Sequence, residues 1–328
     1  MKPIAFLLAL ALPVSVVAAE PVSILINSEK SAVDFLAGSD LVTRYHIGVN
    51  VAKPYFWPLY GPGQVPMTRD WPMKKDTPKE ATDHPHQKSA WFCHGDVVPV
   101  GLKVAPSGDK RVKGVDFWSE GAGHGRMVCV AISSPKPGTI KTYNEWRDSA
   151  GLKIMDETRV ISLHLVGESR LLVLDIDLHA SVCPIIFGDT KEGSMGVRVN
   201  EQIRLQNKGE RSQMANAAGK IGEKDVWGMS SDWCDYSGAI GGKHAGIAVF
   251  DDQKNSARAC WHARGYGLMA ANPFGRKESG FPAKKGETEL VKLDKDAHLK
   301  LRYAIFLHAG DAKAGKVAEA YEQFLKLQ

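Results

Sequence analysis

The sequence predicts a mainly β protein built from packed antiparallel sheets. Apolar or alternating runs of strand length recur along the chain, bounded by Gly, Ser and Pro. They follow one another at intervals of roughly 10 to 15 residues, with few helical patterns between them, unlike βαβ units. The composition, with 44% hydrophobic and 24% charged residues, is ordinary for a globular protein. The mature chain is therefore expected to fold as one β domain.

The expected strands alternate or are apolar throughout, as strands are when one or both faces are buried. Residues 32–36 alternate between apolar and polar side chains, whereas residues 126–132 and 171–179 are nearly continuous apolar runs. The strands are expected at residues 32–36, 41–49, 126–132, 158–166, 171–179, 246–250, 257–263 and 299–307.

One helix is expected, at the C-terminus. Asp311 is placed to cap it, and the apolar side chains that follow fall on one helical face. That face is formed by Val317, Ala320, Tyr321, Phe324 and Leu325. The helix is expected to pack on the outside of a sheet.

The segment from Lys53 to Asp96 breaks the strand pattern. Seven of the 17 prolines lie between Pro54 and Pro85. Long irregular loops in compact domains are usually functional or disordered, and the Trp, Tyr and Phe content argues against disorder. The segment is expected to be an ordered, proline-stiffened loop that walls a pocket.

The first 19 residues have the features of a secretory signal peptide. Lys2 precedes an apolar run from Ile4 to Val17, and small residues at 17–19 place the cleavage before Glu20. The run is shorter than the about 20 apolar residues that span a bilayer, and no later stretch approaches that length. The expected product is residues 20–328, a single domain without a membrane span, working in the periplasm or outside the cell.

The charges and cysteines exclude several classes of protein. The net charge of +5 comes from interspersed residues, and no basic run mixes with aromatics as in a nucleic-acid patch. The five cysteines form no C-x-x-C pair, which argues against zinc ribbons and thioredoxin-like sites. An exported compartment permits disulfides, although the odd number of cysteines leaves at least one thiol free. The alternative is that most of the cysteines are small buried apolar residues. No pairing follows from spacings this wide.

The densest group of chemically active residues is DHPHQKSAWFCHG, residues 83–95. If this stretch is extended, His84, His86 and Lys88 project to one face. Such a face suits a general acid or base, because imidazole titrates near neutral pH. A metal held by His84, His86 and His94 is an alternative, as is a structural histidine pair beside a turn.

Further candidates surround this group. Arg69 is suited to clamp a carboxylate or sugar hydroxyls, or to pair with Asp70 and hold the loop. Trp91 and Trp118 offer faces for a sugar ring, or pack in the core. The remaining candidates are Asp116 with Glu120 four residues on, His179 at a strand end, and a late set of His262, Arg264 and Asn272.

The run from Lys53 to Trp118 resembles a bacterial family of exported proteins labelled PmoA-like. The matching pieces are KPYFWPLYGPGQVPMTRDWPM, DHPHQKSAWFCHGDV and GVDFWSE. The label comes from a subunit of a membrane monooxygenase with several membrane spans. Since no span follows the signal peptide, the resemblance implies export and carries no expectation of that activity.

The chain is also similar to galactose mutarotase-like proteins, which are large antiparallel β-supersandwiches that bind sugars. Their two histidines are matched by Asp83-His84-Pro85-His86 and by Asp177-Leu178-His179. Their late general-base Glu has no match near residues 260–264. The similarity implies a supersandwich that binds a sugar, and the missing Glu favours a sugar reaction other than mutarotation, with His, Arg or Tyr as the acid/base group.

The expected function is therefore binding of a sugar or glycoside, followed by elimination, hydrolysis or epimerisation through histidine acid/base chemistry. The expected catalytic residues are His84, His86, His179 and His262. The expected substrate contacts are Arg69, Asp70, Lys88, Trp91, Asp116, Trp118, Arg264 and Asn272. No cofactor motif is present, since G-x-S-x-G, Walker and H-E-x-x-H patterns are absent. A non-catalytic sugar-binding protein, a histidine-ligated metal protein and a structural protein remain alternatives.

Overall fold

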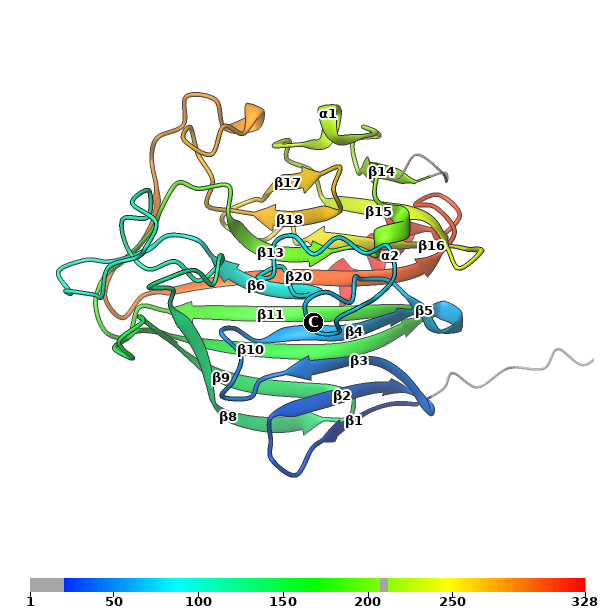
Figure 1. Ribbon diagram of the computed structural model, residues 1–328, viewed down its shortest axis with the longest axis horizontal. Coiled ribbons are helices and arrows are strands. Elements are labelled where there is room, and N and C mark those ends of the chain that lie inside the picture. The colour runs from blue at the N-terminus through cyan, green and yellow to red at the C-terminus, as the bar shows by residue number, and fades with distance from the viewer. Residues whose placement is uncertain (1–20, 207–211, 328) are drawn as a thin grey trace, which may run out of the picture.

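The computed structural model describes residues 21–206 and 212–327, so the predicted signal peptide lies outside the described residues. Three antiparallel sheets form the fold (Figure 1). The first has the order β1-β2-β3-β4-β6-β13-β18-β17, with β5 paired to β4. Its strands are β1 (Val22–Ile26), β2 (Ala32–Ala37), β3 (Asp40–His46), β4 (Tyr55–Gly61), β5 (Val65–Pro66), β6 (Ala90–His94), β13 (Gly193–Arg198), β17 (Cys260–Arg264) and β18 (Leu268–Asn272).

The second sheet has eight strands in the order β14-β15-β16-β20-β11-β10-β9-β8. They are β8 (Arg126–Lys136), β9 (Thr139–Arg147), β10 (Lys153–Val166), β11 (Ser169–His179), β14 (Gln213–Asn216), β15 (Trp233–Ile240), β16 (Lys243–Asp251) and β20 (His298–Ala309). A third sheet joins β7 (Val97–Pro99), β12 (Ile185–Phe187) and β19 (Val291–Leu293). The helices are α1 (Glu223–Val226) and α2 (Val317–Lys326), with 3-10 turns at Pro62–Gln64, Glu201–Ile203 and Pro282–Lys284.

The two large sheets pack face to face around one apolar core. Phe92 of β6 contacts Trp146 of β9 and Tyr303 of β20, with ring centroids 6.4 and 6.1 Å apart. In Figure 1 the sheets run in the same order from top to bottom, one from β17 to β1 and the other from β15 to β8. The predicted antiparallel supersandwich is confirmed.

All eight predicted strands are present, most of them longer than expected. The prediction of one irregular loop from Lys53 to Asp96 was wrong, because β4, β5 and β6 lie within it. Strand β6 has every residue buried and therefore shows no alternation. The irregular part is confined to residues 67–89.

The C-terminal helix is confirmed, but its start differs from the prediction. Asp311 Oδ1 accepts hydrogen bonds from the backbone of Lys313 and Ala314, so it stabilises the preceding turn rather than α2. The residue before the helix is Lys316, with φ of 54°. Phe324 packs on Phe250 of β16, which places α2 on the outer face of the eight-stranded sheet, as predicted.

Within residues 21–206 and 212–327, no helix is long and apolar enough to cross a membrane. All five cysteines lie in these ranges and all are free thiols. The open question of disulfide pairing is thereby answered: the cysteines are separate, mostly buried side chains.

Candidate functional site

The site lies on the face of the nine-stranded sheet that is turned away from the core. Phe92 points into the core, so Trp91, its neighbour on β6, points to the opposite face. Gly196 of β13 is opposite Trp91 in the register, and Arg198 lies two residues further along the same face. Segment 67–89 covers this face, and Figure 1 shows it crossing in front of the middle strands.

Two buried arginines hold one carboxylate beneath this segment. Arg69 and Arg198 both have fully buried side chains. Asp83 Oδ1 accepts from Arg69 Nη1 at 2.6 Å and from Arg198 Nη2 at 2.8 Å. Although burial opposes ionisation, the charge of Arg198 and the two hydrogen bonds lower the pKa of Asp83 to about 2. Asp83 is therefore a fixed negative charge at physiological pH.

The chain then turns sharply at His84. Arg69 Nη2 donates to the carbonyls of Asp83 and His84 at 2.9 and 2.6 Å, and Gln87 N donates to the His84 carbonyl at 2.9 Å. His84 has φ of 41°, in the left-handed region. The expectation of an extended stretch with His84, His86 and Lys88 on one face was wrong, because residues 84–87 form a turn.

The turn presents the His84 ring at the surface in a fixed orientation. Its Nδ1 lies 3.1 Å from Asp83 Oδ2, and the side chain is 41% exposed. The ring stacks on Tyr266, with centroids 5.1 Å apart and planes 6° apart. A ring nitrogen beside a carboxylate carries the proton, which leaves Nε2 of a neutral His84 as the acceptor. No described residue hydrogen-bonds that Nε2.

Two further imidazoles are close to His84. The His86 ring lies edge-on to it, 5.7 Å away. Burial, followed by the charge of Lys53, lowers the pKa of His86 to about 3. Burial, followed by the charges of Lys191 and Arg264, lowers the pKa of His262 to about 3. Both rings are therefore neutral near pH 7. We refer to His84, His86, His262 and Tyr266 as the histidine cluster.

A charged bridge flanks the cluster. Glu120 accepts from the buried Lys53 at 2.7 Å and from Lys88 at 2.5 Å. Although burial opposes ionisation, the two ammonium groups lower the pKa of Glu120. Lys88 also lies over the ring of Tyr55, 5.8 Å from its centroid. These three side chains form a salt-bridged network that acts on His86 in two directions. The positive charge of Lys53 lowers the pKa of His86, and the negative charge of Glu120 raises it.

Several expected substrate contacts are engaged within the protein. Trp91 and Trp118 are buried edge-to-face, 5.0 Å apart, so neither offers an open face to a sugar. Asp116 accepts from the backbone of Trp118 and Ser119. Asn272 donates to the Thr190 carbonyl. Arg69 anchors the loop through Asp83 rather than through Asp70.

The other candidates lie apart from the cluster or at its edge. Asp70 accepts from Thr77 and Lys74. His179 is at the end of β11 in the eight-stranded sheet, where it stacks on His298 at 4.2 Å. Arg264, at the cluster's edge, pairs with Glu223 at 3.1 Å. The structure thus brings His84, His86 and His262 together and leaves His179 elsewhere.

The structure does not gather the residues of the metal alternative. His94 is fully buried, contacts Phe187 and Phe274, and hydrogen-bonds to the Gly188 carbonyl. Across residues 21–206 and 212–327, no group of three or more His, Cys, Asp or Glu side chains is placed to hold a metal ion.

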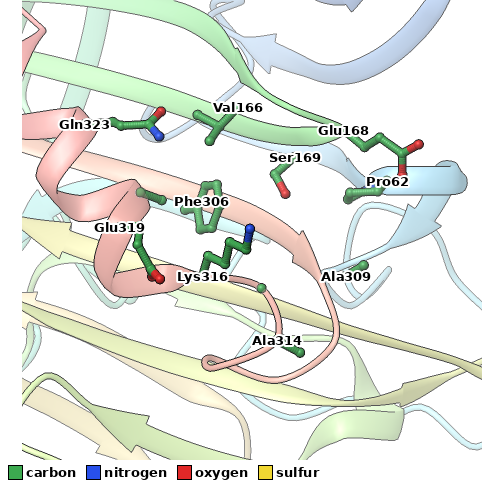
Figure 2. Close-up of a pocket in the computed structure, with 12 residues that line it drawn as sticks. Pro62, Val166, Glu168, Ser169, Phe306, Ala309, Ala314, Lys316, Glu319 and Gln323 are labelled. Atoms are coloured by element: carbon green, nitrogen blue, oxygen red, sulfur yellow. The ribbon is translucent and has the colours of Figure 1, made fainter. Parts of the chain in front are cut away.

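A surface pocket of about 280 Å³ lies on the other sheet, beside α2. Figure 2 shows Phe306 at its base and Lys316, Glu319 and Gln323 along the helix side. None of the histidine cluster lines it. It is separate from the candidate site.

Asp83, Arg198 and Tyr266 complete the site but were not among the predicted site residues. Asp83 directly precedes His84, so an acid next to a histidine in the sequence could have indicated that the two side chains pair. Arg198 and Tyr266 lie on β13 and on the turn between β17 and β18, and no local pattern links them to residue 84.

Several solved structures are similar in fold at low identity. A polysaccharide lyase has a TM-score of 0.35 and 13% identity, with 90% of this chain and 33% of that chain covered. An alpha-galactosidase from Lactobacillus brevis has a TM-score of 0.38 and 7% identity, with 82% and 38% covered. A galactose mutarotase related enzyme from Lactobacillus acidophilus has a TM-score of 0.34 and 6% identity, with 88% and 98% covered. The chain thus spans 33% and 38% of the length of the first two.

No curated protein sequence matches the chain, and none of the comparisons supports the PmoA-like resemblance. The model of DUF6807, a family of unknown function, matches residues 32–322. The chain belongs to the DUF6807 family.

Proposed function

We propose that this protein is an exported carbohydrate-active enzyme that uses His84 as its acid/base group. The observation that carries the proposal is the Asp83–His84 pair, with Nδ1 and Oδ2 3.1 Å apart. Asp83 fixes the ring orientation and the proton on Nδ1, and it stabilises the imidazolium that forms when Nε2 takes a proton.

The cost of this arrangement argues for chemistry rather than a simple loop anchor. Arg69 and Arg198 are fully buried, and burying a charged side chain is costly unless it is paired. His84 also has a backbone conformation that non-glycine residues seldom adopt. An anchor needs neither a strained backbone nor a surface imidazole with a free Nε2.

Carbohydrate is proposed as the substrate because aromatic and hydrogen-bonding groups lie together at the surface. Arg264, Lys88 and Glu120, around the stacked rings of His84 and Tyr266, supply donors and acceptors for hydroxyl groups. The solved structures described above bear the names of carbohydrate enzymes, in agreement with this choice. The signal-like residues 1–19 are the basis for proposing that the enzyme works outside the cytoplasm.

A thermal-shift screen followed by product analysis tests the proposal. The panel contains neutral, acidic and keto sugars and short oligosaccharides, each with and without EDTA. A ligand at 100 times its dissociation constant adds about 2.7 kcal/mol of stability. We expect one sugar class to raise the melting temperature and the matching glycoside to be turned over, insensitive to EDTA.

The variant His84→Ala should keep the thermal shift and lose turnover, whereas His244→Ala, at an exposed position, serves as the control. A thermal shift without product from any glycoside favours a sugar-binding protein. Loss of stability with EDTA and no response to sugars favours a metal protein.

A further inference from the structure

Segment 83–88 takes part in two clusters of ion pairs, and each cluster holds two cations around one carboxylate. At the start of the segment, Asp83 pairs with both of the buried arginines described above. At its end, Lys88 shares the Glu120 carboxylate with Lys53, at 2.5 and 2.7 Å. Among the ion pairs of the described residues, four cations therefore share two carboxylates, which is an excess of two positive charges.

The buried cluster shows the effect of this excess. Burial, followed by the positive charge of Arg198, lowers the pKa of Arg69 to about 10, although Asp83 acts in the opposite direction. Arg198 Nη1 donates to a neutral group, since its acceptor at 2.6 Å is the side-chain oxygen of Gln87. Because buried charges are costly unless they are paired, an anion bound at this surface is favoured over a neutral ligand.

Lys88 is the cation through which a ligand reaches this excess charge. The other three cations are at most 1% exposed, whereas the side chain of Lys88 is 19% exposed. A lysine ammonium has three N–H donors. Within the described residues, Glu120 alone accepts a hydrogen bond from the ammonium of Lys88. The remaining donors can therefore bind a ligand.

The ammonium of Lys88 is held in place close to His84. It lies over the ring of Tyr55, 5.8 Å from the centroid, and that ring stacks on His46 at 4.7 Å. The turn hydrogen bond from Gln87 N to the His84 carbonyl brings the two Cα atoms within about 7 Å of each other. Lys88 is the next residue, so its Cα lies within about 11 Å of that of His84. One oligosaccharide can therefore contact both side chains.

We propose that the sugar bound at this site carries an anionic group, a carboxylate or a sulfate, and that Lys88 binds this group while His84 contacts the same oligosaccharide. The inference rests on the proposed function and names its substrate class, acidic rather than neutral oligosaccharides. A hydrogen bond between two charged groups is stronger than one to a neutral hydroxyl. The anionic group also adds negative charge to a site in which cations outnumber carboxylates.

Binding of matched acidic and neutral oligosaccharides to the full mature chain tests the inference. The probes are an oligogalacturonate with its methyl ester and a sulfated oligosaccharide with its desulfated form, so that each pair shares one sugar skeleton. Isothermal titration calorimetry measures the dissociation constants. We expect one acidic probe to bind at least about 10-fold more tightly than its neutral form. About 1 M NaCl should remove most of this preference, because salt screens exposed ion pairs.

The pair that shows the preference identifies the anionic group as a carboxylate or a sulfate. Equal or tighter binding of the neutral form in both pairs overturns the inference, and so does a thermal shift with neutral sugars when neither acidic probe binds. In both cases the proposed function stands. Absence of binding by every sugar, neutral or acidic, rejects the inference together with the proposed function.

Three variants test the assignment to Lys88. Lys88→Met removes the charge and leaves Glu120 paired with Lys53, so the melting temperature should stay close to that of wild type. Affinity for the acidic probe should fall about 10-fold or more, with little change for its neutral form. Lys88→Arg keeps the charge and should keep most of the preference. Lys74→Met, at a 61% exposed lysine of segment 67–89, is the control and should bind both forms as wild type does. An undiminished preference in Lys88→Met overturns the role of Lys88.

Discussion

The imidazole of His84 and the phenol of Tyr266 lie face to face, with ring centroids 5.1 Å apart and planes 6° apart. The Arg198 guanidinium also lies over the Tyr266 ring, 4.6 Å from its centroid. Arg198 also holds Asp83, which in turn contacts His84. Tyr266 thus contacts both a buried cation and the surface imidazole, and its stacking orients the plane of the His84 ring.

This stacking leads to opposite expectations for two substitutions of Tyr266. Tyr266→Phe keeps the ring and loses only the hydroxyl, so turnover should stay within a few-fold of wild type. Tyr266→Ala removes the support of His84 and should lower kcat by at least about 10-fold, in line with the effect of small misplacements of catalytic groups. Steady-state kinetics on the sugar from the thermal-shift screen measures both. A large loss in Tyr266→Phe would mean that the hydroxyl itself takes part.

In the proposed mechanism Asp83 positions His84, and its removal should affect the rate more than substrate binding. Asp83→Asn places an amide beside Nδ1 and favours the wrong tautomer of His84. We expect kcat to fall about 10²- to 10⁴-fold with little change in KM. Asp34→Asn, which breaks an exposed pair with Arg44, is the matched control and should leave kcat unchanged. A rise in KM alone would instead mean that Asp83 only shapes the loop.

The buried histidines make the fold sensitive to mild acid. His262 titrates at about 6.5 when unfolded and about 3 when folded, so below about pH 6.5 the unfolded chain binds one more proton. Stability is then lost as pH falls, by about 1.4 kcal/mol per pH unit for each such histidine. Urea unfolding between about pH 6 and pH 5 measures this slope. The slope should be shallower by about 1.4 kcal/mol per pH unit in His262→Gln. An unchanged slope would show that His262 does not contribute.

The C-terminal helix should add substantially to stability through Phe324. This fully buried side chain packs on Phe250, and Arg302 lies 4.4 Å from its ring centroid. Phe324→Ala should lower the free energy of unfolding by about 3–5 kcal/mol. Glu322→Ala, at an exposed position on the same helix, should change it by less than about 0.5 kcal/mol. Equal effects of the two substitutions would mean that α2 is not docked as described.

The five thiols should be slow to react until the protein unfolds. Burial raises the pKa of Cys93 to about 12 and that of Cys260 to about 11, and only the thiolate is reactive. We expect mass spectrometry after alkylation to show five modified thiols in denatured protein without reductant. Fewer than five without reductant, and five with it, would reveal a disulfide and contradict the free thiols of the structure.

The alternation of apolar and polar residues was sufficient to predict those strands that have one buried and one solvent-exposed face. Residues 32–36 and 158–166 alternate, and both lie in strands. Strands β6 and β13 are buried along their whole length, so their sequences do not alternate. Because they mix Gly, Ser, His and Arg with apolar residues, they do not form an apolar run either. Strand β4 was missed because prolines are rare within strands, and Pro58 lies inside this one.

The candidate site was predictable only in its local part. The density of His and Asp at residues 83–86 indicated the segment, but its conformation depends on Arg69 reaching the carbonyls of Asp83 and His84. That contact makes the segment turn instead of extending. Arg198 reaches the site only because β13 pairs with β6. No local sequence pattern predicts the register between two strands so far apart in the chain. The same holds for His179, whose strand lies in the other sheet.

The most direct measurement is the turnover of wild type and His84→Ala on the sugar that gives the largest thermal shift, with the shift recorded for both proteins. We expect the variant to keep the shift and to lose turnover by at least about 10²-fold, because only the proton transfer is removed. Equal turnover in the two proteins would contradict the central claim that His84, oriented by Asp83, is the acid/base group of this site.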